Sequence, residues 1–166
     1  TLAITLKGTL IIFSAFCILS SFVSRKGSSK FYNIPAQQLD LVKILEEDIE
    51  GSKARQIDSF QISEFVTLRE YKVYLERIEQ DSTKAYYNSQ LPDTNMGSQK
   101  IRDEYFGNAE YNACPVLGVS WDNARNYCKW KTIRDNGDSI RFVYRLPKCS
   151  EWLAANVYLS KSGKGH

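Results

Sequence analysis

The side chains that could do chemistry in this 166-residue chain are few and scattered. The one histidine, His166, stands at the end of the chain, where it is a poor base for a serine or cysteine triad. Cys17, Cys114, Cys128 and Cys149 show neither a two-residue spacing nor a histidine cluster, which argues against a zinc site. We therefore expect no catalytic residue and no cofactor or metal ligand in this chain.

Acidic and aromatic side chains are the next candidates. The adjacent carboxylates at 46–48 lie in a polar run, which is more typical of a solvated surface than of a metal site. Trp121, Trp130 and Trp152 are expected to anchor the core rather than to form a sugar platform. Arg145 is expected to pair with a carboxylate or a backbone carbonyl inside the fold rather than with a ligand.

The charge distribution argues against nucleic acid as a partner. The formal charge of +3 depends on four cations in residues 1–30, a segment with no acid, and their removal leaves 18 basic against 19 acidic residues. A nucleic-acid binder needs a basic face to displace counterions from phosphates. The body of this chain has no such surplus.

The N-terminal residues 1–27 resemble a targeting segment. Residues 9–23, TLIIFSAFCILSSFV, are uncharged and mostly apolar, and they lie between Lys7 and a basic pair at 25–26. The run is shorter than the roughly 20 residues of a membrane-spanning helix and suits a secretory signal. We expect export, with the segment either cleaved or kept as a membrane anchor, and lipid attachment at Cys17 is the less favoured alternative.

The rest of the chain divides into a linker and one domain. Residues 28–38 are expected to be the linker and residues 39–166 one domain. The hydrophobic content of the whole sequence, 43%, suits a packed globular core. The chain begins at Thr1 and ends on a helical pattern, so we expect it to be part of a longer reading frame. Without the leader three cysteines remain, an odd number that cannot pair completely.

The first half of this domain predicts a strand followed by a helix. Alternation predicts a strand at 56–64, whereas 39–50 is compatible with either a strand or a helical turn. A capping box at Thr67 and Glu70 starts a helix with an apolar stripe from Tyr71 to Ile78. The polar residues 81–102 are expected to form a long surface loop, a weak candidate for a partner site.

The second half predicts two further helices around a strand. Ser120 is a suitable cap for a helix that carries Trp121, Ala124 and Cys128 at helical spacing. The Asn-Gly pair at 136–137 predicts a turn, and residues 142–146 a strand. A third helix is expected to open at Pro147, because proline is favoured at the first helical position.

Three ordered stretches carry a family resemblance: FQISEFVTLREYKVYL at 60–75, CPVLGVSWDNARNYCKW at 114–130 and RLPKCSEWLAA at 145–155. They resemble the formylglycine-generating, sulfatase-modifying factor family, over its N-terminal part. The resemblance implies an α+β, irregular, loop-rich fold of the C-type-lectin-like kind, incomplete at its C-terminus. The signature positions, expected to be structural, are Thr67, Tyr71, Pro115, Val116, Ser120, Trp121, Ala124, Tyr127, Cys128, Trp130, Arg145, Leu146, Pro147, Glu151 and Trp152.

Some residues are similar to a narrower branch, the gliding-motility and type IX secretion lipoproteins of Bacteroidetes. These are the aromatic tract at 105–111, the stretch PVLGVSW at 115–121 and LPDT at 91–94. The resemblance implies an exported, non-catalytic structural component of the cell envelope, in the periplasm or at the outer membrane. Its partners would be envelope or secretion-system proteins, with the membrane contacted through the N-terminal segment.

The enzymes of the family bind copper through a late cysteine pair, and no cysteine here matches that pair. Copper, or calcium, is implied only if the part beyond this chain is enzyme-like. Lys148 and Cys149 depart from the usual third motif, and Lys148 cannot accept a hydrogen bond at the helix start. Two alternatives remain: a formylglycine-forming oxidase whose catalytic half lies outside this chain, and an exported ligand-binding domain.

Overall fold

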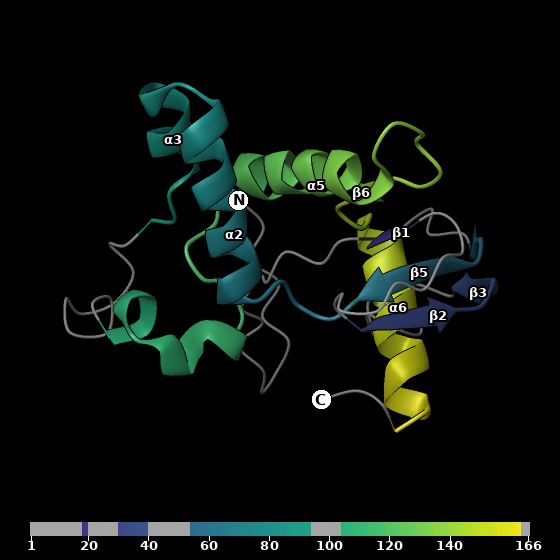
Figure 1. The fold of residues 1–166 in the computed structure, drawn as a ribbon. Helices are drawn as coiled ribbons and strands as arrows, with labels where there is room; N and C mark the ends of the chain where they lie inside the picture. Colours follow the sequence, from purple (N-terminus) through teal and green to yellow (C-terminus); the bar gives the residue numbers. More distant parts are fainter. Residues whose placement is uncertain (1–17, 20–29, 40–53, 94–103, 164–166) are drawn as a thin grey trace.

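The computed structural model describes residues 18–19, 30–39, 54–93 and 104–163, and Figure 1 shows their arrangement. Helices and small sheets are mixed, as expected for an α+β domain. In chain order the elements are β1 (Ile18–Leu19), β2 (Phe31–Ile34), β3 (Gln37–Leu39), β4 (Arg55–Ile57), β5 (Phe60–Ser63), α2 (Leu68–Asp81), α3 (Lys84–Gln90), η1 (Ala109–Ala113), α5 (Trp121–Asn136), β6 (Tyr144–Arg145) and α6 (Cys149–Lys161).

The larger sheet has the strand order β2-β5-β1-β6, and β3 and β4 form a separate pair. All these pairings are antiparallel, and β2 meets β5 in the register Phe31↔Ser63 to Ile34↔Phe60. The single strand expected at 56–64 is two strands, β4 and β5. Figure 1 shows α6 lying across one face of this sheet region.

The linker expected at 28–38 is not what the structure shows for its described part. Residues 31–34 and 37–39 are strands β2 and β3, and Ile34 and Leu39 are almost fully buried. Phe31, Tyr32 and Ile34 are residue types that strands favour, but whether so short a segment joins a sheet is decided by its pairing with distant residues. Of the expected targeting segment 1–27, the structure describes only residues 18–19, which form β1. Residues 40–50, for which a strand or a helical turn was expected, lie outside the described residues. In the part of the chain that is described, no helix is both long and apolar enough to span a membrane.

Helix α2 begins as the sequence predicts. The Thr67 hydroxyl accepts from the amide of Glu70 at 3.2 Å, and the Glu70 carboxylate accepts from the amide of Thr67 at 2.9 Å. This reciprocal pair confirms the capping box, which satisfies two backbone donors that the first turn leaves open. Tyr71, Tyr74 and Ile78 form the buried stripe.

The surface loop expected at 81–102 is wrong for its first part, because residues 84–90 form α3. Thr83 caps this helix by accepting from the amide of Tyr86 at 3.2 Å. Gln90, at the end of α3, is only 3% exposed. Residues 94–102 lie outside the description.

Helix α5 starts after Ser120, whose hydroxyl accepts from the amide of Asn123 at 3.2 Å, so this predicted start is confirmed. It ends at Gly137, which adopts a φ of 62°. The strand expected at 142–146 shortens to Tyr144–Arg145. The cause is the Asn136 side chain, which accepts from the amides of Arg141 and Phe142 and donates to the Phe142 carbonyl at 2.8 Å.

The third helix begins two residues later than expected, at Cys149 rather than Pro147. Lys148 occupies the capping position and its ammonium accepts no hydrogen bond, as its chemistry requires. Instead the Glu151 carboxylate accepts from the amide of Lys148 at 2.7 Å, which supplies half of a capping box.

The described residues form two hydrophobic clusters. The first lies among α2, α5 and the residues around β6, and the second between α6 and the strands β2 to β5. The first has as its buried members Val66, Leu68, Tyr71, Tyr74, Ile78, Val116, Tyr127, Cys128, Phe142 and Tyr144. The second has Ile34, Leu39, Ile57, Phe60, Ile62, Ala154 and Ala155.

Candidate functional site

The first two sequence motifs meet at the starts of their helices. Thr67 forms an isolated antiparallel bridge with Pro115, the amide of Val116 donates to the Val66 carbonyl at 2.9 Å, and the amide of Leu68 donates to the Cys114 carbonyl at 2.8 Å. Val116 is buried at this junction. The pairing fixes the first turn of α2 against the segment that leads to α5.

A glycine in the second motif holds the end of α3 in place. The amide of Asp93 donates to the Gly118 carbonyl at 2.7 Å. Gly118 has a φ of 72°, and a Cβ built there would stand 2.4 Å from the Asp93 carbonyl oxygen. Only glycine suits both the conformation and this close approach.

The third motif is tied by an ion pair. The Arg145 guanidinium donates to both oxygens of Glu151, at 2.8 Å and 2.7 Å, and also to the Leu146 carbonyl at 3.2 Å. This confirms that Arg145 pairs within the fold. Burial opposes ionisation of Glu151, but the bonds from Arg145 and from the Lys148 amide outweigh it and lower the pKa of the carboxyl. Pro147 and Trp152, in the same motif, are half-buried.

The cysteines of the described part stand on different elements. Cys128 is buried in α5, Cys114 is half-buried just after η1, Cys149 is exposed at the start of α6, and all three are free thiols. In the ranges that the structure describes, no three His, Cys, Asp or Glu side chains form a group able to hold a metal ion. Cys128 packs as the small apolar side chain expected from its position.

The crossing of α2 and α5 is built from aromatic rings. Tyr74 contacts Tyr71, Tyr127 and Trp130 with ring centroids 5.4, 5.6 and 5.2 Å apart. Gln90 closes this cluster, because its side-chain oxygen accepts from the Tyr74 hydroxyl at 3.0 Å and its backbone carbonyl accepts from the Tyr71 hydroxyl at 2.8 Å. Burial raises the pKa of both Tyr71 and Tyr74, so they stay protonated hydrogen-bond donors.

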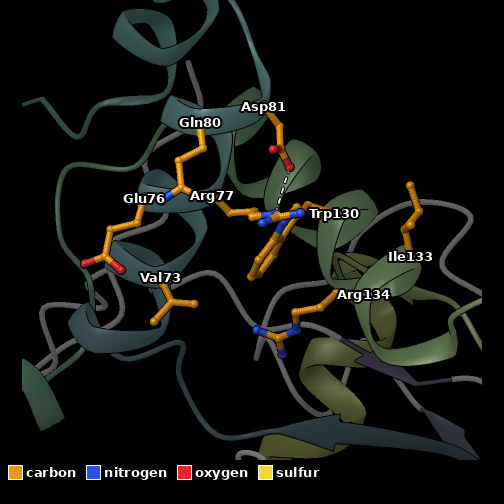
Figure 2. Close-up of a pocket in the computed structure, with 8 residues that line it drawn as sticks. All are labelled: Val73, Glu76, Arg77, Gln80, Asp81, Trp130, Ile133 and Arg134. Atoms are coloured by element: carbon orange, nitrogen blue, oxygen red, sulfur yellow. Dashed lines mark ion pairs between the residues drawn. The ribbon is translucent and has the colours of Figure 1, made fainter.

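A groove of about 520 Å³ lies above this cluster, between α2 and α5. Figure 2 shows Trp130 at its centre, with Val73 on one side and Ile133 on the other. Val73 is 43% exposed and Ile133 is 66% exposed. The eight residues that line the groove are Val73, Glu76, Arg77, Gln80, Asp81, Trp130, Ile133 and Arg134.

Charged groups surround this apolar centre. Arg77 pairs with Asp81 at 2.7 Å, drawn in Figure 2 on the side of Trp130 opposite Arg134. The Arg134 guanidinium lies 4.6 Å from the Trp130 ring centroid and pairs with Asp135 at 2.7 Å. Burial opposes ionisation of Asp135, yet hydrogen bonds and charges from Arg134 and Lys131 lower the pKa of its carboxyl. Arg77 and Arg134 are therefore each held beside the groove by a carboxylate.

The outer side of α5 carries a second tryptophan in the same arrangement. Trp121 is 64% exposed, and the Arg125 guanidinium lies 4.6 Å from its ring centroid. The expectation that Trp121 anchors the core is thus wrong for this chain, because as the first residue of α5 it points away from the tyrosine cluster. Trp130 is half-buried against that cluster, as expected.

Sequence reasoning identified Trp130 but missed the other groove residues. Val73 and Ile133 fall outside the apolar stripes of their helices, and that deviation was the available signal. How the two helices cross, which brings Val73 and Ile133 to the same groove, depends on packing between distant segments.

The comparison with protein families supports the resemblance seen in the motifs. A family model described as "Sulfatase-modifying factor enzyme 1-like domain" matches residues 29–163. The chain therefore belongs to the sulfatase-modifying factor family. No curated protein matches the chain, and no solved structure matches it.

Proposed function

We propose that this chain is an exported, non-catalytic member of the sulfatase-modifying factor family that works through protein contacts in a cell-envelope assembly. The observation that carries the proposal is the groove between α2 and α5. Its exposed Val73 and Ile133 flank a tryptophan stacked on an arginine. Tryptophan and arginine are enriched among the residues that contribute most to protein–protein binding.

The signature residues give the proposal further support, because many of them hold the fold together. Thr67 and Ser120 cap helices, Arg145 and Glu151 form an internal ion pair, and Tyr127 is buried between the helices. A domain that keeps these structural residues retains a rigid frame for the groove.

The proposed setting is a gliding-motility or type IX secretion assembly, with the C-type-lectin-like arrangement of the family. It rests on the aromatic tract, where Tyr105 stacks on Tyr111 with centroids 5.1 Å apart and its hydroxyl donates to the Pro115 carbonyl. Export and attachment to the envelope rest on the composition of the apolar run at 9–23 alone, since two of its residues, Ile18 and Leu19, pair as β1 with β5 and β6. The competing function is the copper-dependent oxidation of a sulfatase cysteine to formylglycine, since the family includes such enzymes.

The test is affinity isolation of the tagged chain from its native envelope after mild crosslinking. Ile133→Asp places a charge in the groove, and Ile140→Asp is the matched control, because Ile140 is 69% exposed and lies outside the groove. We expect Ile133→Asp to lose the partner and Ile140→Asp to keep it. Equal recovery with both variants would remove the groove from the proposal. Formation of formylglycine in a sulfatase-derived peptide by a protein that carries this chain together with the late cysteine pair of the family would establish the oxidase instead.

A further inference from the structure

The solvent side of α5 presents two cations between two apolar side chains. Trp121, Arg125, Lys129 and Ile133 follow one another at four-residue spacing, and all four are exposed. At 1.5 Å and about 100° per residue, the four residues span about 18 Å along the helix axis and turn about 120° around it. We call these four residues the α5 face; it shares Ile133 with the groove. Figure 1 shows α5 along the upper margin of the molecule.

The cations of the α5 face are weakly neutralised within the chain. Arg125 meets Asp122 at 3.4 Å, and the Asp122 side chain is itself 78% exposed. Lys129 makes no ion pair with any residue in the described ranges. Lys131, by contrast, is buried and pairs with Asp135 at 3.1 Å. On the solvent side of α5, the positive charge available to a partner is therefore that of Arg125 and Lys129.

We propose that the α5 face binds an acidic amphipathic helix of a partner protein. This inference rests on the proposed function and specifies the chemistry of the partner. Carboxylates one turn apart on such a helix, about 6 Å, match the spacing of Arg125 and Lys129. Apolar side chains on either side of these carboxylates cover Trp121 and Ile133. Opposite charges facing one another specify the partner and its register, while the apolar ends supply most of the affinity.

A protein helix fits this face better than a polyanion does. Asp122 lies beside Arg125 and repels anions of either kind. A helix can place its two carboxylates opposite Arg125 and Lys129 and leave Asp122 unopposed, whereas a polyanion carries a charge at every unit. The chain beyond residue 30 has 18 basic and 19 acidic residues, so it has no net positive charge to attract a polyanion to this face. Two cations bounded by tryptophan and isoleucine match a short segment that is both acidic and apolar.

The experiment measures binding of labelled, helix-stapled peptides of about three turns to the full chain. The acidic peptide carries two glutamates one turn apart with leucines on either side, and a second peptide replaces the glutamates with lysines. The test variant is Arg125→Glu/Lys129→Glu. Its control is Arg55→Glu/Lys161→Glu, which makes the same change in net charge at two exposed positions on β4 and α6.

We expect the acidic peptide to bind the wild-type chain and the lysine peptide to bind more weakly. The test variant should lose about tenfold in affinity for the acidic peptide, as two ion pairs become two like-charge contacts. The control variant should stay within about twofold, because its charges lie elsewhere.

The proposal is overturned if the acidic peptide does not bind, if both peptides bind equally, or if both variants lose the same affinity. It is also overturned if the α5 face binds anionic vesicles but no peptide. Binding of a peptide with the sequence 39–50, LDLVKILEEDIE, would assign the face to this chain's own acidic segment and also overturn a partner helix. If the test variant still recovers the envelope partner, this inference fails and the proposed function stands. If the wild-type chain recovers no partner, the proposed function fails.

Discussion

Replacing Gly118 with alanine should destabilise the fold by two effects that add. The residue has a φ of 72°, and holding a non-glycine residue in such a conformation costs about 1–3 kcal/mol. The new Cβ would also stand 2.4 Å from the Asp93 carbonyl oxygen, so the backbone must separate there. Losing the Asp93 amide bond to Gly118 adds about 1 kcal/mol.

Gly163→Ala provides the control, because Gly163 has a φ of 65° but no atom lies within 4 Å of a Cβ built there. Chemical denaturation should give Gly118→Ala the lower free energy of unfolding, by about 1 kcal/mol or more relative to Gly163→Ala. Hydrogen exchange adds a local measurement: the Asp93 amide should lose protection in Gly118→Ala alone. Equal stabilities together with a protected Asp93 amide would refute the reasoning.

Three further predictions concern residues that hold the frame. Glu151→Gln weakens the bond to Arg145 and should cost about 1–3 kcal/mol of stability at neutral pH. Folding lowers the pKa of Glu151, so this stabilisation is present above the ordinary carboxyl pKa and is lost as pH falls through the pKa of the folded state. The stabilities of the wild-type chain and of Glu151→Gln should therefore converge in acid denaturation. Gln90→Ala removes the nearer acceptor of the Tyr74 hydroxyl and leaves it the 3.5 Å contact with the Tyr86 hydroxyl. The change should cost about 1–3 kcal/mol, with Leu91→Ala as an exposed control in thermal unfolding. Thr67→Ala removes the cap of α2 and should cost about 1 kcal/mol in urea denaturation, whereas an unchanged midpoint would mean that the capping box adds nothing.

The starts of α2 and α5 could be predicted from the sequence, because a cap is a local interaction. Thr67 and Glu70 lie three residues apart, and the hydroxyl of Ser120 reaches an amide three residues along. Such short-range geometry needs no information from the rest of the chain. The family motifs were readable for the same reason, since they are continuous stretches.

Features that depend on distant residues were not predicted. Strand β2 has only four residues, Phe31–Ile34, and becomes a strand through its pairing with β5, about 30 residues later. The strand expected at 142–146 is shorter in the structure, because the Asn136 side chain forms hydrogen bonds with backbone groups of Arg141 and Phe142. The groove needed the crossing of α2 and α5, which no local pattern contains.

The position of α6 has a consequence for the order in which the chain can fold. The second hydrophobic cluster joins Ile34 and Leu39 to Ala154 and Ala155, and the Gln37 side chain donates to the Ala154 carbonyl at 3.2 Å across 117 residues. Until α6 has been synthesised, one face of the early strands has no cover and remains exposed to chaperones or to aggregation. The α2–α5 region uses contacts closer in sequence and is expected to form first, because contacts between distant residues are slow to close. Folding of this part of the domain therefore waits for α6.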